Sequence, residues 1–328
     1  MLYSNKQKII AITGASGLIG SHLIPVLLRE GYQLRSFSRR LQLKSLGVEQ
    51  IQGDVRSLKA VSELTRGCDA VIHLAGVAHT TLRSQAEMDE AERINVDGAR
   101  NVFAAALDAG VQRVILVSSA HVYAGQQGVG LDENSPTSGD SFYARTKLLV
   151  EQSGLEAANA NRMDVVIARP CLTYGPGVRF NLESLMRAIH GRYYFGVSGT
   201  NPMRSLLSVG NAALAIAHLI QAGESGKVYN IADKSPVPLV EFVNSLADLM
   251  QVSRPRNLHK VAIRAAIAGT APLRWMGLRS PVNHESLRKL TTSFTLDVNA
   301  LAATGFRWSD DGLVTKKQMV DAYLDARK

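Results

Sequence analysis

Residues 13–20 read Thr13-Gly14-Ala15-Ser16-Gly17-Leu18-Ile19-Gly20, and this stretch decides the fold. An apolar run at residues 8–13, typical of a buried strand, comes directly before the glycines, and apolar residues at helical spacing follow them. Glycine at such a turn lets the backbone approach a pyrophosphate, which the free amides and the dipole of the helix start attract. The stretch therefore predicts a dinucleotide site. Because its spacing is G-x-x-G-x-x-G and not the usual G-x-G-x-x-G, the turn alone leaves an ordinary strand-to-helix connection open as an alternative.

Further strand-like runs near residues 33, 48, 70, 113 and 165 alternate with helical patterns, and residues 227–231 add a late strand. This alternation predicts an α/β fold with a doubly wound parallel sheet. We expect a dinucleotide-binding domain at residues 1–170, to which residues 205–232 return. A smaller, discontinuous C-terminal substrate lobe would then comprise residues 171–204 and 233–328. A chain of 328 residues, 46 % of them hydrophobic, is long enough for both parts.

Tyr143 and Lys147 are four residues apart on a helix predicted over residues 143–155, so they share one helix face. A lysine ammonium near a tyrosine favours the phenolate, and we expect it to lower the pKa of Tyr143 and make that residue a usable acid and base. Since this spacing is common, an ordinary surface pair is the alternative. Upstream, Ser118 and Ser119 end the apolar run 113–117, at the sheet edge where parallel sheets bind ligands.

With the glycine turn, the strand-end serines and the Y-x-x-x-K pair in this order, the chain resembles the short-chain dehydrogenase/reductase superfamily, and more narrowly its extended branch that acts on nucleotide sugars. Five further motifs carry the resemblance, at residues 53–55, 73–76, 95–101, 169–177 and 204–213. The resemblance implies a Rossmann domain, a nicotinamide cofactor and the catalytic residues Ser119, Tyr143 and Lys147. The cofactor contacts that it implies are at Gly14, Ser16, Gly17, Leu18, Ile19, Asp54, Val55, Leu74, Ala75, Gly76, Tyr143, Lys147 and Pro170.

The end of the second predicted strand decides the choice of cofactor. An NAD-selecting site carries an acidic residue there, whereas this chain has Ser38, Arg39 and Arg40. A hydroxyl and guanidinium groups suit the additional 2′-phosphate of NADP. We therefore predict NADP(H), with NAD as the alternative if one arginine only caps the loop.

The resemblance leaves three reactions open: 4-epimerisation, 4,6-dehydration and reduction of a keto sugar. Dehydratases of this branch carry an aspartate and a glutamate where this chain has Ala120 and His121, and its epimerases keep NAD tightly bound, unlike a site built for NADP. We therefore predict reduction of a 4-keto group by NADPH. The chain is similar to reductases of UDP-4-keto-6-deoxy-N-acetylhexosamines in bacterial O-antigen biosynthesis. The alternatives are an NAD-dependent 4-epimerase and a non-catalytic NADP sensor.

In the implied mechanism, Lys147 holds the ribose of the nicotinamide, Ser119 binds the substrate carbonyl, and Tyr143 protonates the alkoxide after hydride transfer. His79 and His121 are candidates for contacts with the sugar. Candidates for binding the nucleotide diphosphate are Asn181, Phe195 and Arg204.

Composition narrows the classes of ligand, metal site and cellular location that this protein could have. The net charge of +9 is scattered, without a basic run or stacking aromatic residues, so it suits two polyanionic ligands better than nucleic acid. Two cysteines, Cys68 and Cys171, show no disulfide or metal-ligand spacing, so no metal is expected. No signal peptide or membrane-spanning run is evident, and we expect a cytoplasmic protein whose apolar segment 261–278 docks on the lobe or touches a membrane surface. Helices near 87–109 and 143–160 resemble those that pair in homodimers of the family.

Overall fold

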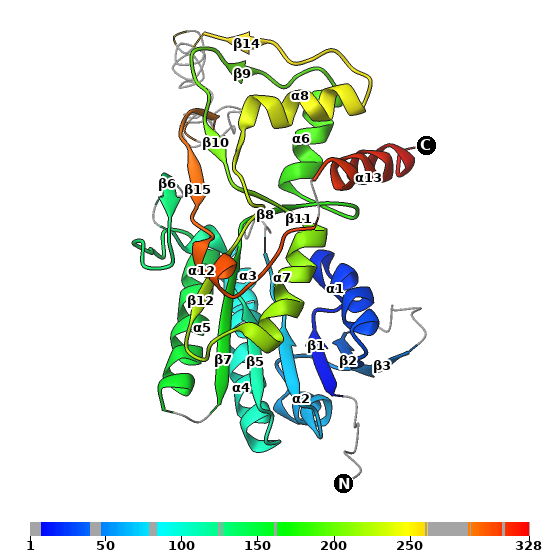
Figure 1. Ribbon diagram of the computed structural model, residues 1–328, viewed down its shortest axis with the longest axis vertical. Helices are drawn as coiled ribbons and strands as arrows, with labels where there is room; N and C mark the ends of the chain where they lie inside the picture. The colour runs from blue at the N-terminus through cyan, green and yellow to red at the C-terminus, as the bar shows by residue number, and fades with distance from the viewer. Residues whose placement is uncertain are drawn as a thin grey trace.

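The computed structural model describes residues 8–39, 47–78, 84–123, 125, 127–160, 163–259, 261, 288, 290–309 and 312–327. Within these residues, the largest sheet has seven strands, all parallel, in the order β12-β7-β5-β4-β1-β2-β3 (Figure 1). The order runs outward from β1 in both directions, which confirms the predicted doubly wound sheet. The strands are β1 (Ile9–Thr13), β2 (Gln33–Ser38), β3 (Val48–Gln52), β4 (Ala70–His73), β5 (Arg113–Val117), β7 (Asp164–Pro170) and β12 (Val228–Ile231).

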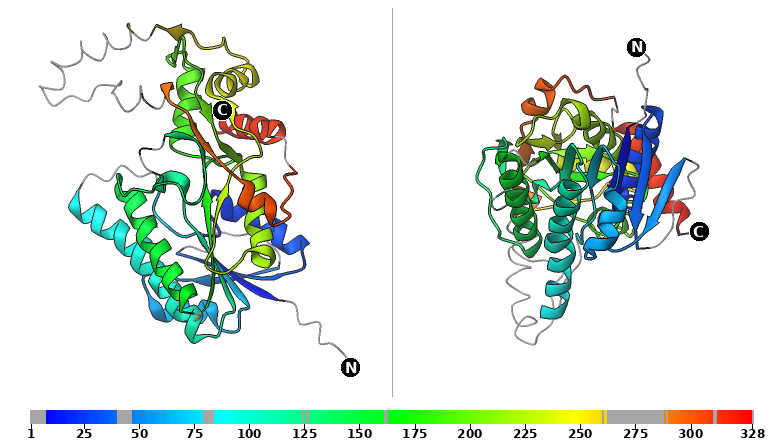
Figure 2. Two further views of the ribbon diagram at one scale, coloured as in Figure 1. Left: turned by 60° about the vertical axis from the view of Figure 1, so that its left-hand side comes forward. Right: turned by 90° about the horizontal axis from the view of Figure 1, so that it is seen from below.

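Helices cover both faces of this sheet, which is why the central strands are continuous apolar runs (Figure 2). Alternate residues of each strand enter two separate cores: Ile10 and Ile12 face one, and Ala11 faces the other. The first core contains α1 (Leu18–Arg29) and α7 (Val209–Ala222). The second contains α2 (Leu58–Thr65), α4 (Gly98–Asp108) and α5 (Phe142–Asn159).

Between α2 and α4, the chain forms α3 (Gln85–Glu92) and then a π-helical turn, η1 (Arg93–Asp97), in place of the single helix expected near residues 87–109. Ser84 and Glu87 form a capping box that begins α3. A 3-10 turn, η2 (Ala120–Val122), follows the end of β5. Both turns lie next to predicted site residues.

A second group of elements lies above the carboxyl ends of the parallel strands in Figure 1. Its helices α6 (Asn181–His190), α8 (Leu239–Leu249) and α13 (Leu313–Asp325) share a core of their own, which includes Met186, Leu246 and Val320. Three small sheets lie among these helices. Two of them are strand pairs: β8 (Leu172–Tyr174) with β11 (Leu206–Ser208), and β9 (Gly196–Val197) with β14 (Asn257–Leu258). The third has the order β13 (Val237–Pro238), β10 (Met203–Arg204), β15 (Phe294–Leu296) and β6 (Gly128–Leu131). The domain limits given above remain a proposal.

After β15, α12 (Asn299–Ala303) returns the chain to the side of β12, where the Trp308 indole donates to the Ala232 carbonyl at 2.8 Å. No helix in the described ranges is long and apolar enough to cross a bilayer. Of the apolar segment 261–278, all but Val261 lies outside the described residues, as do Arg40 and His79.

Candidate active site

The glycine turn between β1 and α1 is built by close backbone contacts. Gly14 has φ +71°, and a Cβ there would lie 2.7 Å from the Ala75 amide nitrogen. Gly17 donates its amide to the Gly14 carbonyl at 3.0 Å, and a Cβ on Gly20 would lie 2.5 Å from that carbonyl oxygen. Each glycine therefore makes room for backbone, which leaves a cradle at the start of α1 that suits a pyrophosphate.

The segment after β4 links this turn to α5, which carries Tyr143 and Lys147. The Thr13 carbonyl and hydroxyl accept the amides of Leu74 and Ala75, at 3.1 and 3.2 Å. At the next residue, a Cβ on Gly76 would lie 3.7 Å from Lys147 Nζ. Leu74, Ala75 and Gly76 thus form a bridge from the cradle to Lys147, along which a dinucleotide could extend.

Ser119, Tyr143 and Lys147 are brought together where β5 ends and α5 begins. The Ser141 hydroxyl caps α5 by accepting the Ala144 amide at 3.1 Å, so Tyr143 lies in the first helical turn. There the Tyr143 phenol is hydrogen-bonded to Ser119. Lys147 Nζ lies 5.8 Å from the centre of the Tyr143 ring and donates to the Val117 carbonyl at 2.9 Å.

Burial dominates the electrostatics of this cluster. It raises the pKa of Tyr143 to about 12, although the hydrogen bond with Ser119 acts in the opposite direction. The expectation that Lys147 lowers the pKa of Tyr143 is therefore wrong in direction, because desolvation of the phenolate outweighs the favourable contacts. Burial also lowers the pKa of Lys147 to about 8. Tyr143 is thus a protonated phenol at neutral pH, as a proton donor must be.

His121 and His73 flank the cluster on different sides. The His121 ring meets the Tyr143 ring edge-on, with 5.9 Å between the ring centres, and its amide donates to the Ser119 hydroxyl at 3.2 Å. His73 is buried at the end of β4, within 2.7 Å of the Thr13 hydroxyl. Burial, with a further contribution from Lys147, lowers the pKa of His73 to about 3, so His73 is neutral.

Asn95 joins the bridge segment to α5 from within η1 (Arg93–Asp97). Its Oδ1 accepts the Val77 amide at 2.7 Å, while its Nδ2 donates to the Val77 carbonyl and to the Thr146 hydroxyl, both at 3.1 Å. Thr146 directly precedes Lys147. The π-helical turn, a feature common at functional sites, thus points a buried amide at both Val77, which follows the bridge, and Thr146 of α5.

The end of β2 presents the residues expected to choose the cofactor. Ser38 is partly buried and Arg39 is exposed. Asp54, which follows β3, forms an ion pair with Arg56 at 2.7 Å. The hydrogen bond from Arg56 lowers the pKa of Asp54, and the charge of Arg39 contributes in the same direction.

The other predicted cofactor residues differ in exposure. Ser16 and Gly17 are exposed in the turn, and Leu18 and Ile19 are partly buried at the start of α1. Val55 and Pro170 are buried, so they reach a ligand less readily than the turn does.

The candidates for nucleotide binding lie in the second group of elements. Asn181 is the first residue of α6, and Phe195 is 44 % exposed. Arg204, on β10, is partly buried beside Tyr194. Burial lowers the pKa of the Arg204 guanidinium, while Tyr194 opposes this shift. An anionic ligand would offset this desolvation.

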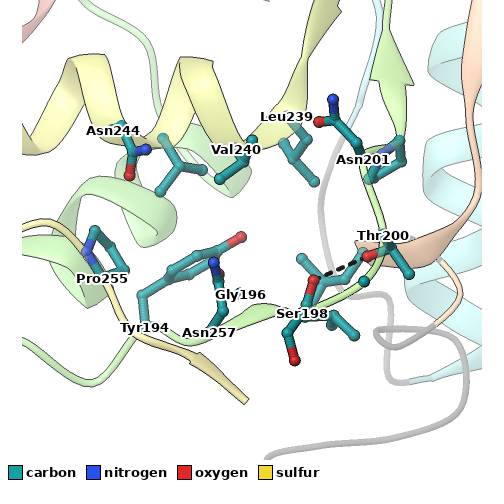
Figure 3. A pocket seen from close by; sticks show the side chains of 15 residues that line it. Tyr194, Gly196, Ser198, Thr200, Asn201, Leu239, Val240, Asn244, Pro255 and Asn257 are labelled. Atoms are coloured by element: carbon teal, nitrogen blue, oxygen red, sulfur yellow. Dashed lines mark hydrogen bonds between the residues drawn. The ribbon is translucent and has the colours of Figure 1, made fainter. Parts of the chain in front are cut away.

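A cavity of about 220 Å³ lies next to these residues, between α8 and the paired strands β9 and β14. Figure 3 shows Leu239, Val240 and Asn244 of α8 on one side, with Tyr194 and Asn257 on the other. Its lining combines apolar side chains with hydroxyl and amide groups. Phe195, Arg204 and Asn181 are not among the residues that line it, and neither are Ser119, Tyr143 and Lys147.

Sequence reasoning missed Tyr194 and the buried partners of the catalytic cluster. Tyr194 stands in a Tyr193-Tyr194-Phe195 run, and only the folded lobe shows which of the three rings lines the cavity. Glu151 lies one turn beyond Lys147 on the same face of α5, a spacing that could have been noticed. In the described ranges, no group of three histidine, cysteine or acidic residues could hold a metal ion.

Comparison with known proteins agrees with this geometry. Residues 10–232 match the family model described as NAD dependent epimerase/dehydratase family. A 4-hydroxy-2-methyl-3-oxo-4-farnesyl-3,4-dihydroquinoline-1-oxide ketoreductase of Stigmatella aurantiaca is 30 % identical over 328 residues, which cover 96 % of this chain and 95 % of the relative. A UDP-glucose 4-epimerase of Vibrio cholerae is 30 % identical over 250 residues, 73 % of this chain and 75 % of the relative. The structure of MoeE5 in complex with UDP-glucose and NAD is 25 % identical, with a TM-score of 0.75 over 97 % of this chain and 99 % of that chain.

Proposed function

Because this chain belongs to the NAD dependent epimerase/dehydratase family, we propose that it reduces the 4-keto group of a nucleotide-diphosphate sugar with NADPH. The substrate class that we propose is a UDP-4-keto-6-deoxy-N-acetylhexosamine, used in surface polysaccharide biosynthesis. The observation that carries the proposal is the contact of Ser119 with a protonated Tyr143, next to Ala120 and His121. The site has a proton donor for a ketone, but no carboxylate at residues 120 and 121 to eliminate water.

The residues divide the reaction between them. A bound nicotinamide cofactor would supply the hydride. Ser119 donates a hydrogen bond to the ketone oxygen and stabilises the charge that develops on it. Tyr143 then gives its proton to that oxygen, and the Lys147 ammonium stabilises the resulting phenolate and holds the ribose of the cofactor.

The proposed preference for NADPH over NADH is based on the charges at the end of β2. Arg39 is exposed there and can pair with a 2′-phosphate. The sequence holds no acidic residue at positions 38–40 that would bind an unmodified ribose. Asp54 does not replace such a residue, since Arg56 already neutralises it.

The second group of elements supports a nucleotide on the substrate. Arg204 is a partly desolvated cation beside the cavity residue Tyr194, and such a cation suits a diphosphate. The cavity of about 220 Å³ exceeds the roughly 150 Å³ that accommodates a benzene ring, so it has room for the single ring of a pyrimidine base. Asn244 and Asn257 would supply hydrogen bonds to the edge of the base.

The decisive experiment supplies the purified protein with NADPH and a UDP-4-keto-6-deoxy-N-acetylhexosamine made by a separate 4,6-dehydratase. We expect NADPH to be consumed in equal amount with the keto sugar, and the product to gain the mass of two hydrogens. The Tyr143→Phe variant is the control for background reduction. Turnover that is as fast with a simple ketone lacking the nucleotide would contradict the proposed substrate class.

An NAD-dependent 4-epimerase is the second candidate, favoured by the similarity to the UDP-glucose 4-epimerase of Vibrio cholerae. An epimerase returns the hydride to the same sugar and consumes no cofactor. Interconversion of UDP-N-acetylglucosamine and UDP-N-acetylgalactosamine without added NADPH would establish this reading and overturn the reductase. The similarity to a ketoreductase favours net reduction.

A further inference from the structure

Helix α5 is attached to the end of β5 by two contacts one helical turn apart. Lys147 Nζ donates to the carbonyl of Val117 at 2.9 Å, and the Glu151 carboxylate accepts the hydroxyl of Ser118. Val117 and Ser118 are consecutive, and the next residue is Ser119. The side chains at positions 147 and 151 of the helix therefore hold the backbone that carries a catalytic hydroxyl.

Glu151 is deeply buried, with 3 % of its surface exposed, and its charge is matched by Arg169 of β7. Arg169 donates Nε to Oε1 at 3.0 Å and Nη2 to Oε2 at 2.7 Å, a bidentate pair. Its Nη1 donates to the Tyr123 hydroxyl at 3.1 Å and to the Glu133 carbonyl at 3.2 Å. Four hydrogen bonds from the guanidinium therefore fix the pair from two sides.

Stability alone is a weak explanation for such a pair. Removing two charges from water carries a desolvation cost that often equals or exceeds the attraction between them, and apolar residues of similar volume commonly stabilise a core as well. A buried ion pair in contact with the catalytic strand end calls for a role in the reaction.

We propose that Glu151, held in place by Arg169 and Ser118, is a positioning residue that keeps Lys147 as an ammonium ion and fixes it against the end of β5. This inference rests on the proposed function, in which the Lys147 charge supports Tyr143. It adds that the charge depends on a carboxylate one turn away that touches neither substrate nor cofactor.

Among the described residues, the other titratable groups that face Lys147 are Tyr143 and His73, and neither supplies a negative charge at neutral pH. Burial raises the pKa of Tyr143 to about 12 and, with Lys147 contributing, lowers that of His73 to about 3, so both are neutral. Burial lowers the pKa of Lys147 itself, and Glu151 acts against this. Arg169 limits the influence of Glu151 on the pKa of Lys147, because its positive charge partly neutralises the Glu151 carboxylate.

The test measures the protonation of Lys147 directly, by NMR of protein labelled with ¹³C at lysine Cε, with the Lys147 signal assigned by its loss in Lys147→Met. We expect Glu151→Gln to reduce the proton affinity of Lys147 at least tenfold, which is one pH unit. Arg169→Gln should raise it, because Glu151 then faces Lys147 without its counter-charge. Glu151→Asp keeps the charge and should restore most of the wild-type value.

Glu156→Gln is the matched control, since Glu156 is exposed on the same helix and the contact described for its side chain is with Gln152. It should leave the titration of Lys147 unchanged. If Glu151→Gln does not fold, the double variant Glu151→Met with Arg169→Met removes both charges and should still reduce the proton affinity, by less than the single change.

If the titration midpoint of Lys147 in Glu151→Gln, or in the double variant, equals that of the wild-type protein, the proposal is overturned and Glu151 is a structural residue. Because the titration needs no substrate, it is independent of the reaction assay. A protein that reduces no keto sugar but shows the expected shifts would refute the proposed function and keep the link between Glu151 and Lys147. In an active enzyme, the alkaline limb of NADPH binding should move with the Lys147 titration.

Discussion

Replacing Gly14 by alanine should damage both the fold and cofactor binding, for two separable reasons. The first is conformation: φ is +71°, a region that costs an L residue about 1–2 kcal/mol. The second is space, because the added Cβ would lie 2.7 Å from the Ala75 nitrogen and 2.8 Å from the Leu74 carbonyl carbon. Ordinary contacts begin at 3.4 Å, so the turn and the bridge segment must separate by several tenths of an ångström. Such overpacking costs about 1–3 kcal/mol, which brings the expected loss to about 2–5 kcal/mol.

Gly31→Ala is the matched control, since Gly31 has φ +84° and a Cβ there would meet nothing within 4 Å. It should lose only the conformational share, about 1–2 kcal/mol. Urea denaturation of both variants gives the two losses as changes in midpoint at constant slope. In titrations, NADPH should bind at least tenfold more weakly to Gly14→Ala, because the cradle is displaced, and with unchanged affinity to Gly31→Ala. Equal losses of stability with unchanged NADPH affinity would refute the argument that backbone contact requires this glycine.

Four further outcomes are expected. Tyr143→Phe should reduce kcat by roughly 10²- to 10⁴-fold with NADPH affinity nearly unchanged, while Tyr32→Phe, which loses a hydroxyl contact with Gln221 away from the site, should turn over normally in the same assay. Reduction should decline as the pH rises through about 8, where Lys147 loses its proton while the Tyr143 phenol, with a pKa of about 12, keeps its own; a flat profile of kcat/KM to pH 10 would contradict this. NADPH should bind at least tenfold tighter than NADH, about 1.4 kcal/mol, and Arg39→Asp should narrow or reverse this preference in fluorescence titrations. We also expect a homodimer through α4 and α5, which light scattering at micromolar concentration would contradict if it showed a monomer.

Much of the fold could be predicted because its determinants are local in the chain. Apolar runs mark the seven strands of the large sheet, and each of these was expected close to where it lies, from Ile9–Thr13 to Val228–Ile231, whereas the short strands of the other sheets were not predicted. The order of strands follows from the right-handed connections of parallel units. The fixed spacing of Tyr143 and Lys147 likewise placed both side chains on one face of α5 before any contact was known.

Other parts of the site depend on groups that are distant in the sequence. Arg169 meets Glu151 only because α5 packs on β7, and Tyr194 and Leu239 line the same cavity only because the fold brings α8 close to β9. No pattern in either segment indicates these contacts. The cavity lined by Tyr194 and Leu239 was therefore not foreseen, although Phe195, the residue next to Tyr194, was a candidate.

Periodicity and short spacings act within a few residues, so the amino-acid sequence alone indicates the doubly wound sheet, the glycine turn and the candidate residues Ser119, Tyr143 and Lys147. The charge states of Tyr143 and Lys147 depend instead on tertiary packing. The pKa of Tyr143 rises although a lysine lies one turn away, because the elements packed around the phenol exclude water and so penalise the phenolate. Desolvation depends on everything that surrounds a group, and for Lys147 those surroundings include the ends of β4 and β5, which are distant from it in the sequence.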